Sequence, residues 1–208
     1  MILQGAELIN IENLTLYSKK GRAILKNLNL RIGDESLAII GPSGSGKSSL
    51  LLSILNIFDN KRVKGSVFTD KKISCIFQDT SSYLDPTMKI GSQIAECASN
   101  QVANELMKRL RIEDICDKYP HQLSAGQKQR VMIAIAVAIK PDVILADEAL
   151  NNLDKDNADI AKELLGDFQT IFVTHDIDSI LNLVSRVITL NEGGIVQDVE
   201  VSKFTKKS

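Results

Sequence analysis

The sequence predicts an α/β fold with a mostly parallel sheet, an antiparallel β layer and a helical subdomain. A glycine-rich loop at residues 41–48 follows an apolar run typical of a buried strand and precedes an apolar helix. Two β-rich runs, at residues 143–146 and 170–173, flank a helix predicted at residues 157–165. Such alternation favours a parallel sheet with helical crossovers. Near the start of the chain, apolar and polar residues alternate as in half-buried antiparallel strands.

Each element can be placed in chain order. Strands are predicted at residues 8–16, 23–32, 37–40, 73–77, 143–146, 170–173, 187–190 and 194–197. Helices are predicted at residues 49–55, 91–110, 125–139 and 157–165. The first two strands should form the antiparallel layer, and the last two a hairpin. We expect one domain over residues 1–208, with residues 1–79 and 136–208 as the core and β layer, and residues 80–135 as the helical subdomain.

Composition narrows the class of protein. With 44% hydrophobic and 25% charged residues, the chain is typical of soluble globular proteins. The formal net charge of −1 argues against a general nucleic-acid-binding surface. Three scattered cysteines without a C-x-x-C pair favour a reducing, cytoplasmic setting. The longest apolar run, residues 131–139, is well short of the roughly 20 residues that a membrane-spanning helix needs, so a membrane role would require a partner.

The glycine-rich loop carries a specific motif for binding nucleotide phosphates. It matches G-x-x-x-x-G-K-[ST] with Gly41, Pro42, Ser43, Gly44, Ser45, Gly46, Lys47 and Ser48. Glycines let backbone N–H groups turn toward a phosphate, and the helix that follows directs its positive end to the same anion. Lys47 would reach the β- and γ-phosphates, and the Ser48 hydroxyl would ligate Mg²⁺. The alternative is a flexible Gly/Ser-rich loop, but the flanking strand and helix favour a nucleotide site that also includes Ser49.

An acidic pair, Asp147-Glu148, follows the apolar strand predicted at residues 143–146. Most acidic pairs are solvated surface residues, but these two ionisable groups emerge at the end of a buried strand, where ligands of α/β sheets bind. Asp147 would reach the Mg²⁺ through water. Glu148 could hold the attacking water as a general base, a role that typically contributes about 10²- to 10⁴-fold in rate.

A further motif, Leu123-Ser124-Ala125-Gly126-Gln127, precedes a predicted helix. With it, the chain resembles the ATPase subunits of ABC transporters over nearly its whole length. The resemblance implies the ABC ATPase fold, built on a P-loop NTPase core, with two ATPase subunits that meet head to tail. Ser124, Ala125, Gly126 and Gln127 would then contact, in trans, the ATP on the partner's phosphate loop. A helix start rich in N–H groups can hold an anion, although the same residues taken alone form an ordinary helix cap.

The resemblance extends to three more residues and one loop. Gln78 matches a glutamine that senses Mg²⁺ and the transmembrane partner, and His175 a histidine that contacts the γ-phosphate and steadies the attacking water. Tyr17 matches the aromatic residue that stacks on adenine, although a tyrosine at a strand end is more often a packing residue. Residues 151–154 occupy the place of the loop that crosses to the partner's site. Gln78 and residues 80–110 should form the groove for the membrane partner.

Two segments are similar to the branch of the family that imports peptides and nickel. They are residues 76–86, IFQDTSSYLDP, and residues 119–134, which begin YPHQLSAGQ. His121 lies in the second segment, and we interpret it as structural because one histidine without a second ligand makes no metal site. The departures from the family's pattern are Ala125 in place of glycine, Ala149 in place of proline, and the pair Asn151-Asn152.

The resemblance implies an ATP-hydrolysing subunit that powers an ABC importer of peptides, nickel or a metal chelate. ATP and Mg²⁺ would be its cofactors. Its partners would be a second ATPase subunit in a heterodimer, two transmembrane permease subunits and, indirectly, an extracellular substrate-binding protein, with no nucleic acid. It would lie at the cytoplasmic face of the cell membrane as a peripheral subunit. Two alternatives stay open: a soluble ABC ATPase without a transport role, and a partner that binds ATP without hydrolysing it.

Overall fold

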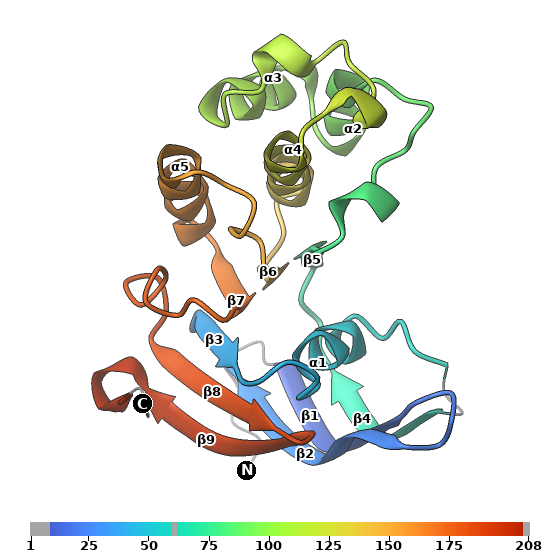
Figure 1. Cartoon of the computed structure of the whole chain (residues 1–208), viewed down its shortest axis with the longest axis vertical. Coiled ribbons are helices and arrows are strands. Elements are labelled where there is room, and N and C mark those ends of the chain that lie inside the picture. Colours follow the sequence, from blue (N-terminus) through green and yellow to red (C-terminus); the bar gives the residue numbers. More distant parts are fainter. Residues whose placement is uncertain (1–8, 60–61, 206–208) are drawn as a thin grey trace. The chain divides into compact units, whose positions relative to one another are not determined.

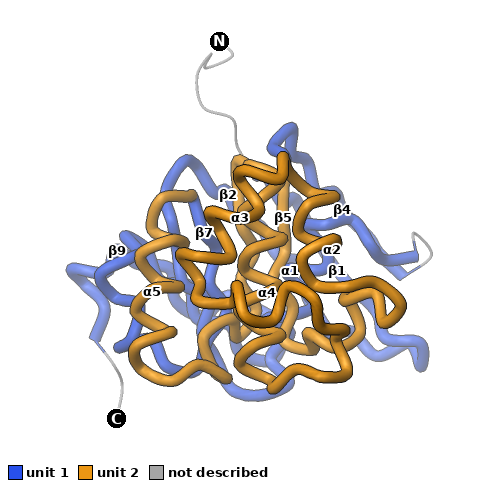
Figure 2. The backbone as a smooth tube through the Cα atoms, turned by 90° about the horizontal axis from the view of Figure 1, so that it is seen from above, with its two compact units in different colours: residues 1–72, 169–208 blue, residues 73–168 orange. Residues whose placement is uncertain are grey.

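The computed structural model describes residues 9–59 and 62–205 (Figure 1). The chain forms two compact units, coloured separately in Figure 2. Unit 1 comprises Met1–Lys72 and Gln169–Ser208, and unit 2 comprises Ile73–Phe168. The predicted division after residues 79 and 135 stays a prediction. Within each unit, the strands end at a group of predicted site residues, so each is described in turn.

In its described residues, unit 1 contains two sets of strands and one α-helix. Its elements are β1 (Ile9–Tyr17), β2 (Ala23–Ile32), β3 (Leu37–Ile40), α1 (Lys47–Ile54), β4 (Val63–Phe68), β7 (Gln169–Val173), β8 (Arg186–Asn191) and β9 (Gly194–Glu200). The first set is antiparallel, with the order β2-β1-β4. In the second, β3 runs parallel to both β7 and β8, and β9 returns antiparallel along β8. The antiparallel layer and the closing hairpin therefore lie where the sequence predicts them, except that Leu8 is outside the described residues.

Irregular pairing explains how β1 and β2 bury their apolar side chains. Both strands change the phase of their alternation, and the register shifts three times along β1: after Ile11, after Leu14 and after Leu16. Asn13 and Asn27 lie at these irregular positions with φ of 50° and 49°, the left-handed region that asparagine tolerates better than most residues. The backbone N–H of Asn27 donates to Thr15 Oγ1 at 3.0 Å, which supplies a partner where the ladder is interrupted.

Strand β4 was not predicted from the sequence. Its six residues, VKGSVF, include a central glycine and lack a continuous apolar face. A Cβ on Gly65 would lie 2.4 Å from the carbonyl oxygen of Asn13, so β4 approaches β1 too closely for any other residue. The strand is thus defined by its pairing with β1, a tertiary contact that a local pattern does not record.

Unit 2 is a pair of parallel strands with four α-helices. Its elements are β5 (Ile73–Ile76), α2 (Ile90–Cys97), α3 (Asn100–Arg109), α4 (Ala125–Ala138), β6 (Val143–Asp147) and α5 (Lys155–Gly166). Helix α4 contacts β5 and the other three helices. Eight of its residues are buried, on several sides of the helix, as expected for a helix at the centre of a core.

The helical stretch expected at residues 91–110 is in fact two helices. The backbone of Ala98 is extended, with φ −155° and ψ 176°, which ends α2. Ser99 then begins α3 as its N-cap, and its hydroxyl accepts from Val102 N–H at 3.4 Å. The apolar spacing of the sequence did not reveal the break. Among the described residues, the helices are all shorter or more polar than a membrane-crossing helix would be.

Candidate functional site

The phosphate loop (residues 41–48) begins where β3 ends, in unit 1. Two of its glycines sit where no other residue would fit. A Cβ on Gly41 would lie 2.1 Å from the carbonyl oxygen of Leu190 in β8, and one on Gly46 would lie 2.7 Å from a methyl group of Leu25 in β2. Both have positive φ, +146° and +105°. The loop is therefore shaped by close packing of backbone against its neighbours.

The turn between β8 and β9 fixes the loop from its other side. The N–H of Gly193 donates to the carbonyl oxygen of Ser45 at 3.1 Å, and the N–H of Lys26 in β2 donates to the carbonyl oxygen of Gly193 at 2.8 Å. Gly193 itself has φ +82°, and a Cβ there would lie 2.2 Å from the carbonyl oxygen of Ile24. The motif gave no sign of this support, since the turn is more than 140 residues away in the sequence.

Lys47 and Ser48 open α1. The Lys47 side chain is buried and points back into the loop, where Nζ donates to the carbonyl oxygens of Gly41 at 2.8 Å and Pro42 at 3.1 Å. A γ-phosphate arriving in the loop would offer this ammonium a charged acceptor in exchange for two neutral ones. Ser48 is exposed in the first turn. The helix follows Gly46, which has no side chain to cap the first N–H groups, so an anion can accept from them.

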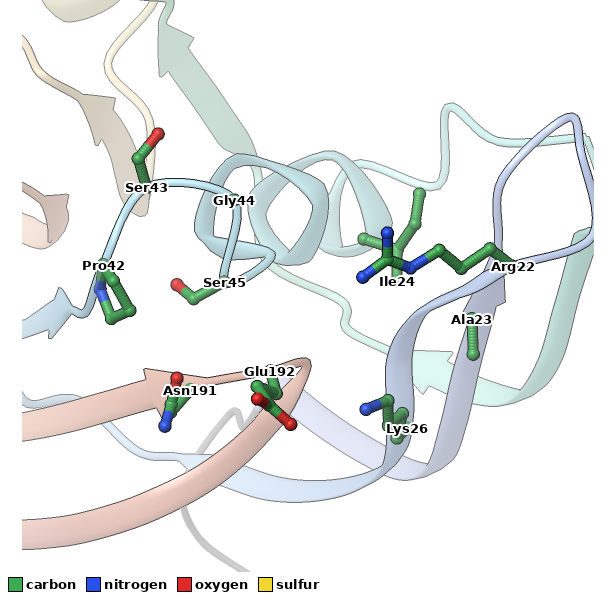
Figure 3. Close-up of a pocket in the computed structure, with 10 residues that line it drawn as sticks. All are labelled: Arg22, Ala23, Ile24, Lys26, Pro42, Ser43, Gly44, Ser45, Asn191 and Glu192. Carbon is green, nitrogen blue, oxygen red and sulfur yellow. The ribbon is translucent and has the colours of Figure 1, made fainter.

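A pocket of about 780 Å³ opens beside the loop in unit 1. Figure 3 shows Pro42, Ser43, Gly44 and Ser45 along one wall and the β8–β9 turn along another. Arg22 and Lys26 bring positive charge to the pocket, and Glu192 brings negative charge. The volume lies in the range of small-molecule sites.

Tyr17 ends β1, also in unit 1. The Lys64 ammonium lies 5.5 Å from the centroid of the Tyr17 ring, and Arg62 Nε donates to the Tyr17 carbonyl oxygen at 2.9 Å. A cation already lies over the ring, so adenine stacking would use the opposite face or displace Lys64. The role of Tyr17 toward adenine stays a prediction.

His175 lies beside the phosphate loop within unit 1. Strands β3 and β7 pair in parallel, with Ile39 opposite Val173, so Gly41 and His175 follow their strands at the same level. The N–H of Thr174 donates to the carbonyl oxygen of Ile39 at 3.4 Å, and His175 is exposed. Carboxyl ends of neighbouring parallel strands meet at one edge, which is where α/β sheets bind ligands.

The acidic pair ends β6 in unit 2. Asp147 and Glu148 are 7% and 4% exposed, which is rare for carboxylates and typical of functional positions. Strands β5 and β6 are parallel with Ile76 opposite Ala146, so Gln78 and Glu148 follow them at the same level. Unit 2 therefore brings together the glutamine and the acidic pair at one strand edge, as unit 1 does for the phosphate loop and His175.

Cys75 lies in β5 opposite Leu145 of β6, close to this strand edge. Burial, and secondarily the negative charge of Asp147, raise the pKa of the Cys75 thiol to about 12. The thiol is thus neutral at physiological pH and inert as a nucleophile.

The motif Leu123-Ser124-Ala125-Gly126-Gln127, called the signature from here on, lies at the start of α4 in unit 2. Ser124 Oγ accepts from Gln127 N–H at 3.2 Å, and Ser124 N–H donates to Gln127 Oε1 at 2.9 Å, which together form a capping box. Ala125, which replaces the usual glycine, is exposed. A Cβ on Gly126 would lie 2.7 Å from the carbonyl oxygen of Asn152, so glycine is required there. The His121 side chain is exposed, and its ring stacks on that of Tyr119. This contact is compatible with the structural role predicted for His121.

The segment after Gln78 forms a short 3₁₀ turn that is capped by the side chain of Asp79. Asp79 begins a 3₁₀ turn at Thr80–Ser82, and its carboxylate accepts from Ser81 N–H at 3.1 Å. The hydrogen bond from the Ser82 hydroxyl is the main cause that lowers the pKa of Asp79. The rings of Phe77 and Tyr83 stack 3.9 Å apart across the turn, which fixes both ends of the Gln78 loop.

The donor set predicted for Mg²⁺ fits that ion. Ser48, Gln78 and Asp147 offer a hydroxyl, an amide oxygen and a carboxylate, which are hard oxygen ligands. In the described part of the chain, no cluster of three His, Cys, Asp or Glu side chains forms an all-protein metal cage. Mg²⁺ bound to a nucleotide uses one or two carboxylates with phosphates and waters and needs no such cage.

The comparison with known proteins decides the family. A profile described as "ABC transporter" matches residues 25–151, more than half of the chain. The chain belongs to the ABC transporter family. Within it, the chain is an ATP-binding domain with the ABC ATPase fold: the dimeric, post-hydrolysis ATP-binding cassette MJ0796, bound to ADP and Pi, is 30% identical with a TM-score of 0.82, over 94% of this chain and all of that one. The predicted family and fold class are both confirmed.

Sequence relatives are also ATP-binding proteins. The chain is 33% identical to the sulfate/thiosulfate import ATP-binding protein CysA of Vibrio cholerae over 91% of its length. It is 32% identical to the oligopeptide transport ATP-binding protein OppD of Lactococcus lactis over 86% of its length. The aligned regions cover 57% and 64% of these two relatives, respectively.

Proposed function

We propose that this chain is an ATP-hydrolysing subunit that powers import by an ABC transporter. The single observation that carries the proposal is the pair of strand edges: one ends in a phosphate loop beside His175, the other in a buried acidic pair beside Gln78. Both are groups that phosphoryl transfer requires, namely a phosphate cradle and a carboxylate to receive a proton. The family membership and the intact Lys47 and Glu148 support it.

Each residue has a step in the proposed reaction. The loop N–H groups and Lys47 bind the β- and γ-phosphates. Ser48, Asp147 and Gln78 would hold Mg²⁺, which would neutralise charge on the phosphate oxygens. Glu148 accepts a proton from water as its oxygen attacks the γ-phosphorus. The bond from phosphorus to the bridging oxygen breaks, and ADP leaves with that electron pair. His175 steadies the attacking water and the γ-phosphate.

The partners follow from the same proposal. A second ATPase subunit would complete the site through its signature residues, and Ser124, Ala125, Gly126 and Gln127 of this chain would serve the partner's ATP. The dimer described for MJ0796 supports a pairing of this kind. Two permease subunits would contact Gln78 and residues 80–110, at the cytoplasmic face of the membrane, with a substrate-binding protein outside.

The cargo is proposed to be a peptide, nickel or a metal chelate, on the likeness of residues 76–86 and 119–134 to that branch. OppD is a relative named for oligopeptides and CysA one named for sulfate and thiosulfate, so ATPase likeness alone does not select the cargo. Uptake of labelled oligopeptide, ⁶³Ni²⁺ and sulfate, in cells with and without this chain, would separate the three. Loss of sulfate uptake alone would contradict the proposed branch.

The proposal is tested on the chain purified through a tag together with its native partners. The wild-type assembly should hydrolyse ATP in the presence of Mg²⁺. Lys47→Ala should lose ATP binding, because the charge that meets the phosphates is removed, whereas the surface variant Lys155→Ala should bind normally. Undiminished ATP binding by Lys47→Ala would contradict the phosphate-loop assignment. If the wild-type assembly binds ATP without hydrolysing it, this chain would instead be a subunit that binds ATP but does not hydrolyse it.

A further inference from the structure

The loop between β6 and α5 (residues 148–154) contains an unexplained departure from the family's pattern, the pair Asn151-Asn152. The two asparagines make different contacts. Asn151 Nδ2 donates to Glu148 Oε2 at 2.8 Å. This is the length of a charge-assisted hydrogen bond, the stronger kind. The carbonyl oxygen of Asn152 instead packs against Gly126, at the first turn of α4.

The backbone of Glu148 needs such support. Its φ is 52°, in the left-handed region that a non-glycine residue occupies only at a cost, and its side chain is 4% exposed. Such a conformation persists when its surroundings over-determine it, commonly at a functional site. Asn151 supplies two of the restraints. Its backbone N–H donates to the Glu148 carbonyl oxygen at 3.2 Å, and its side-chain Nδ2 donates to the Glu148 carboxylate. One residue therefore fixes both the backbone and the carboxylate of Glu148.

We propose that Asn151 is a positioning residue for hydrolysis, which orients the Glu148 carboxylate by donating to Oε2. The proposal rests on the proposed function, in which Glu148 is the general base. A general base must present an oxygen to the attacking water within hydrogen-bond reach. With Oε2 held by Asn151, rotation of the carboxylate is restricted. Positioning of this kind raises rate with little effect on substrate binding.

An amide at position 151 can donate a hydrogen bond to the Glu148 carboxylate. A carboxylate accepts hydrogen bonds and cannot donate them, so its partner must be a donor. Asparagine donates at this distance, while aspartate has the same shape and would place a second negative charge against Glu148. Alanine removes the donor without adding charge. Comparing asparagine, aspartate and alanine at position 151 therefore distinguishes the effect of the hydrogen bond from the effect of side-chain packing in the loop.

The same loop links the base to the signature helix. Asn152 is the next residue after Asn151, and its carbonyl oxygen lies where a Cβ on Gly126 would meet it at 2.7 Å. Displacement of the first turn of α4 would therefore displace the loop that carries Asn151. Asn151 is itself exposed, so its amide can leave Glu148 without unpacking a core.

The test is steady-state ATPase kinetics of the assembly purified with its native partners. We expect Asn151→Ala to lower kcat about tenfold with KM for ATP changed less than twofold, because a hydrogen bond to a charged group is lost. Asn151→Asp should lower kcat further, and Asn151→Gln, which keeps the donor, should recover part of the loss. The matched controls are Asn182→Ala and Asn182→Asp, at an exposed turn of unit 1, which should behave as wild type.

Non-additivity distinguishes positioning from general damage. In a Glu148→Gln background, where the base is absent, Asn151→Ala should lower kcat no further. If Glu148→Gln loses turnover while Asn151→Ala keeps wild-type kcat, or if the two losses multiply, the inference about Asn151 is overturned and the proposed function stands. If Glu148→Gln keeps its turnover, the proposed function fails, and this inference fails with it.

Discussion

The phosphate loop and the β6–α5 loop both follow a strand end, yet they are held in different ways. Backbone packing shapes the phosphate loop: Gly41 and Gly46 lie against β8 and β2 with no room for a Cβ. A side chain shapes the β6–α5 loop, where Asn151 hydrogen bonds to Glu148. The first loop matches its motif at every defined position, whereas the second departs from the pattern of its family.

This difference shows which kind of site a sequence motif can describe. A loop held by backbone contacts needs particular residues, chiefly glycines, at fixed spacing, and a motif records them. A loop held by side-chain hydrogen bonds can be built from several residue types, so its pattern varies while its geometry is kept. The changes below test that contrast, in order of decreasing effect.

The largest effect should come from the base itself. Glu148→Gln is expected to keep ATP binding and to slow turnover by at least about a hundredfold, because the amide no longer accepts a proton from water. ATP binding and steady-state ATPase rates of the purified assembly measure the two quantities. Near-normal turnover in this variant would remove Glu148 from its role.

The next effect concerns the backbone-held loop. Gly41→Ala should lower the free energy of unfolding by about 3 kcal/mol and weaken ATP binding, because its Cβ would lie 2.1 Å from a carbonyl oxygen. Gly44→Ala is the matched control: among the described residues, nothing lies within 4 Å of its Cβ, so only the cost of φ +77° remains, about 1 kcal/mol. Urea unfolding checks both, and equal losses would contradict the packing argument.

A smaller effect should follow loss of the helix cap at the signature. Ser124→Ala is expected to cost about 1 kcal/mol of unfolding free energy, since the first turn of α4 loses its capping acceptor. Ser99 caps α3 through a longer bond, 3.4 Å against 3.2 Å, so Ser99→Ala should cost less. The reverse order in urea unfolding would show that cap geometry does not control these helix ends.

The smallest effect concerns the charge of Asp147. Cys75 should resist alkylation at pH 8, because its pKa of about 12 leaves about one thiol in ten thousand ionised. Removing the carboxylate charge in Asp147→Asn should speed alkylation of Cys75 in the folded chain, since one cause of the raised pKa is gone. Mass spectrometry of iodoacetamide-treated protein measures this, and the urea-unfolded chain is the control for full access. An unchanged rate would mean that Asp147 carries no charge near Cys75.

The sequence predicted most of the fold because its strong patterns are local. Strand Ala23–Ile32 has the predicted bounds, and α4 differs by one residue at its end. The misses share a cause. Strand β4 depends on pairing with β1, and the break at Ala98–Ser99 depends on one extended residue and its cap. Neither feature changes the apolar spacing from which helices and strands are predicted.

The candidate site was predictable to a different degree in its two parts. The phosphate loop could be assigned residue by residue, because its chemistry needs those residue types at that spacing. The role proposed for Asn151 could not, because asparagine after a strand usually signals a turn, and only its 2.8 Å contact with Glu148 distinguishes it. The hydrogen bond from Gly193 to Ser45 could not be predicted either, because it joins the phosphate loop to a turn that is distant in the sequence.

A crystal structure of Glu148→Gln with ATP and Mg²⁺ would show whether the phosphate loop and the acidic pair share one ion. We expect one Mg²⁺ bound by the Ser48 hydroxyl at the usual distance of about 2.1 Å, with the Asp147 carboxylate bonded to a water of the same ion. A structure in which Ser48 and Asp147 lie too far apart to share that ion would rule out the proposed magnesium site.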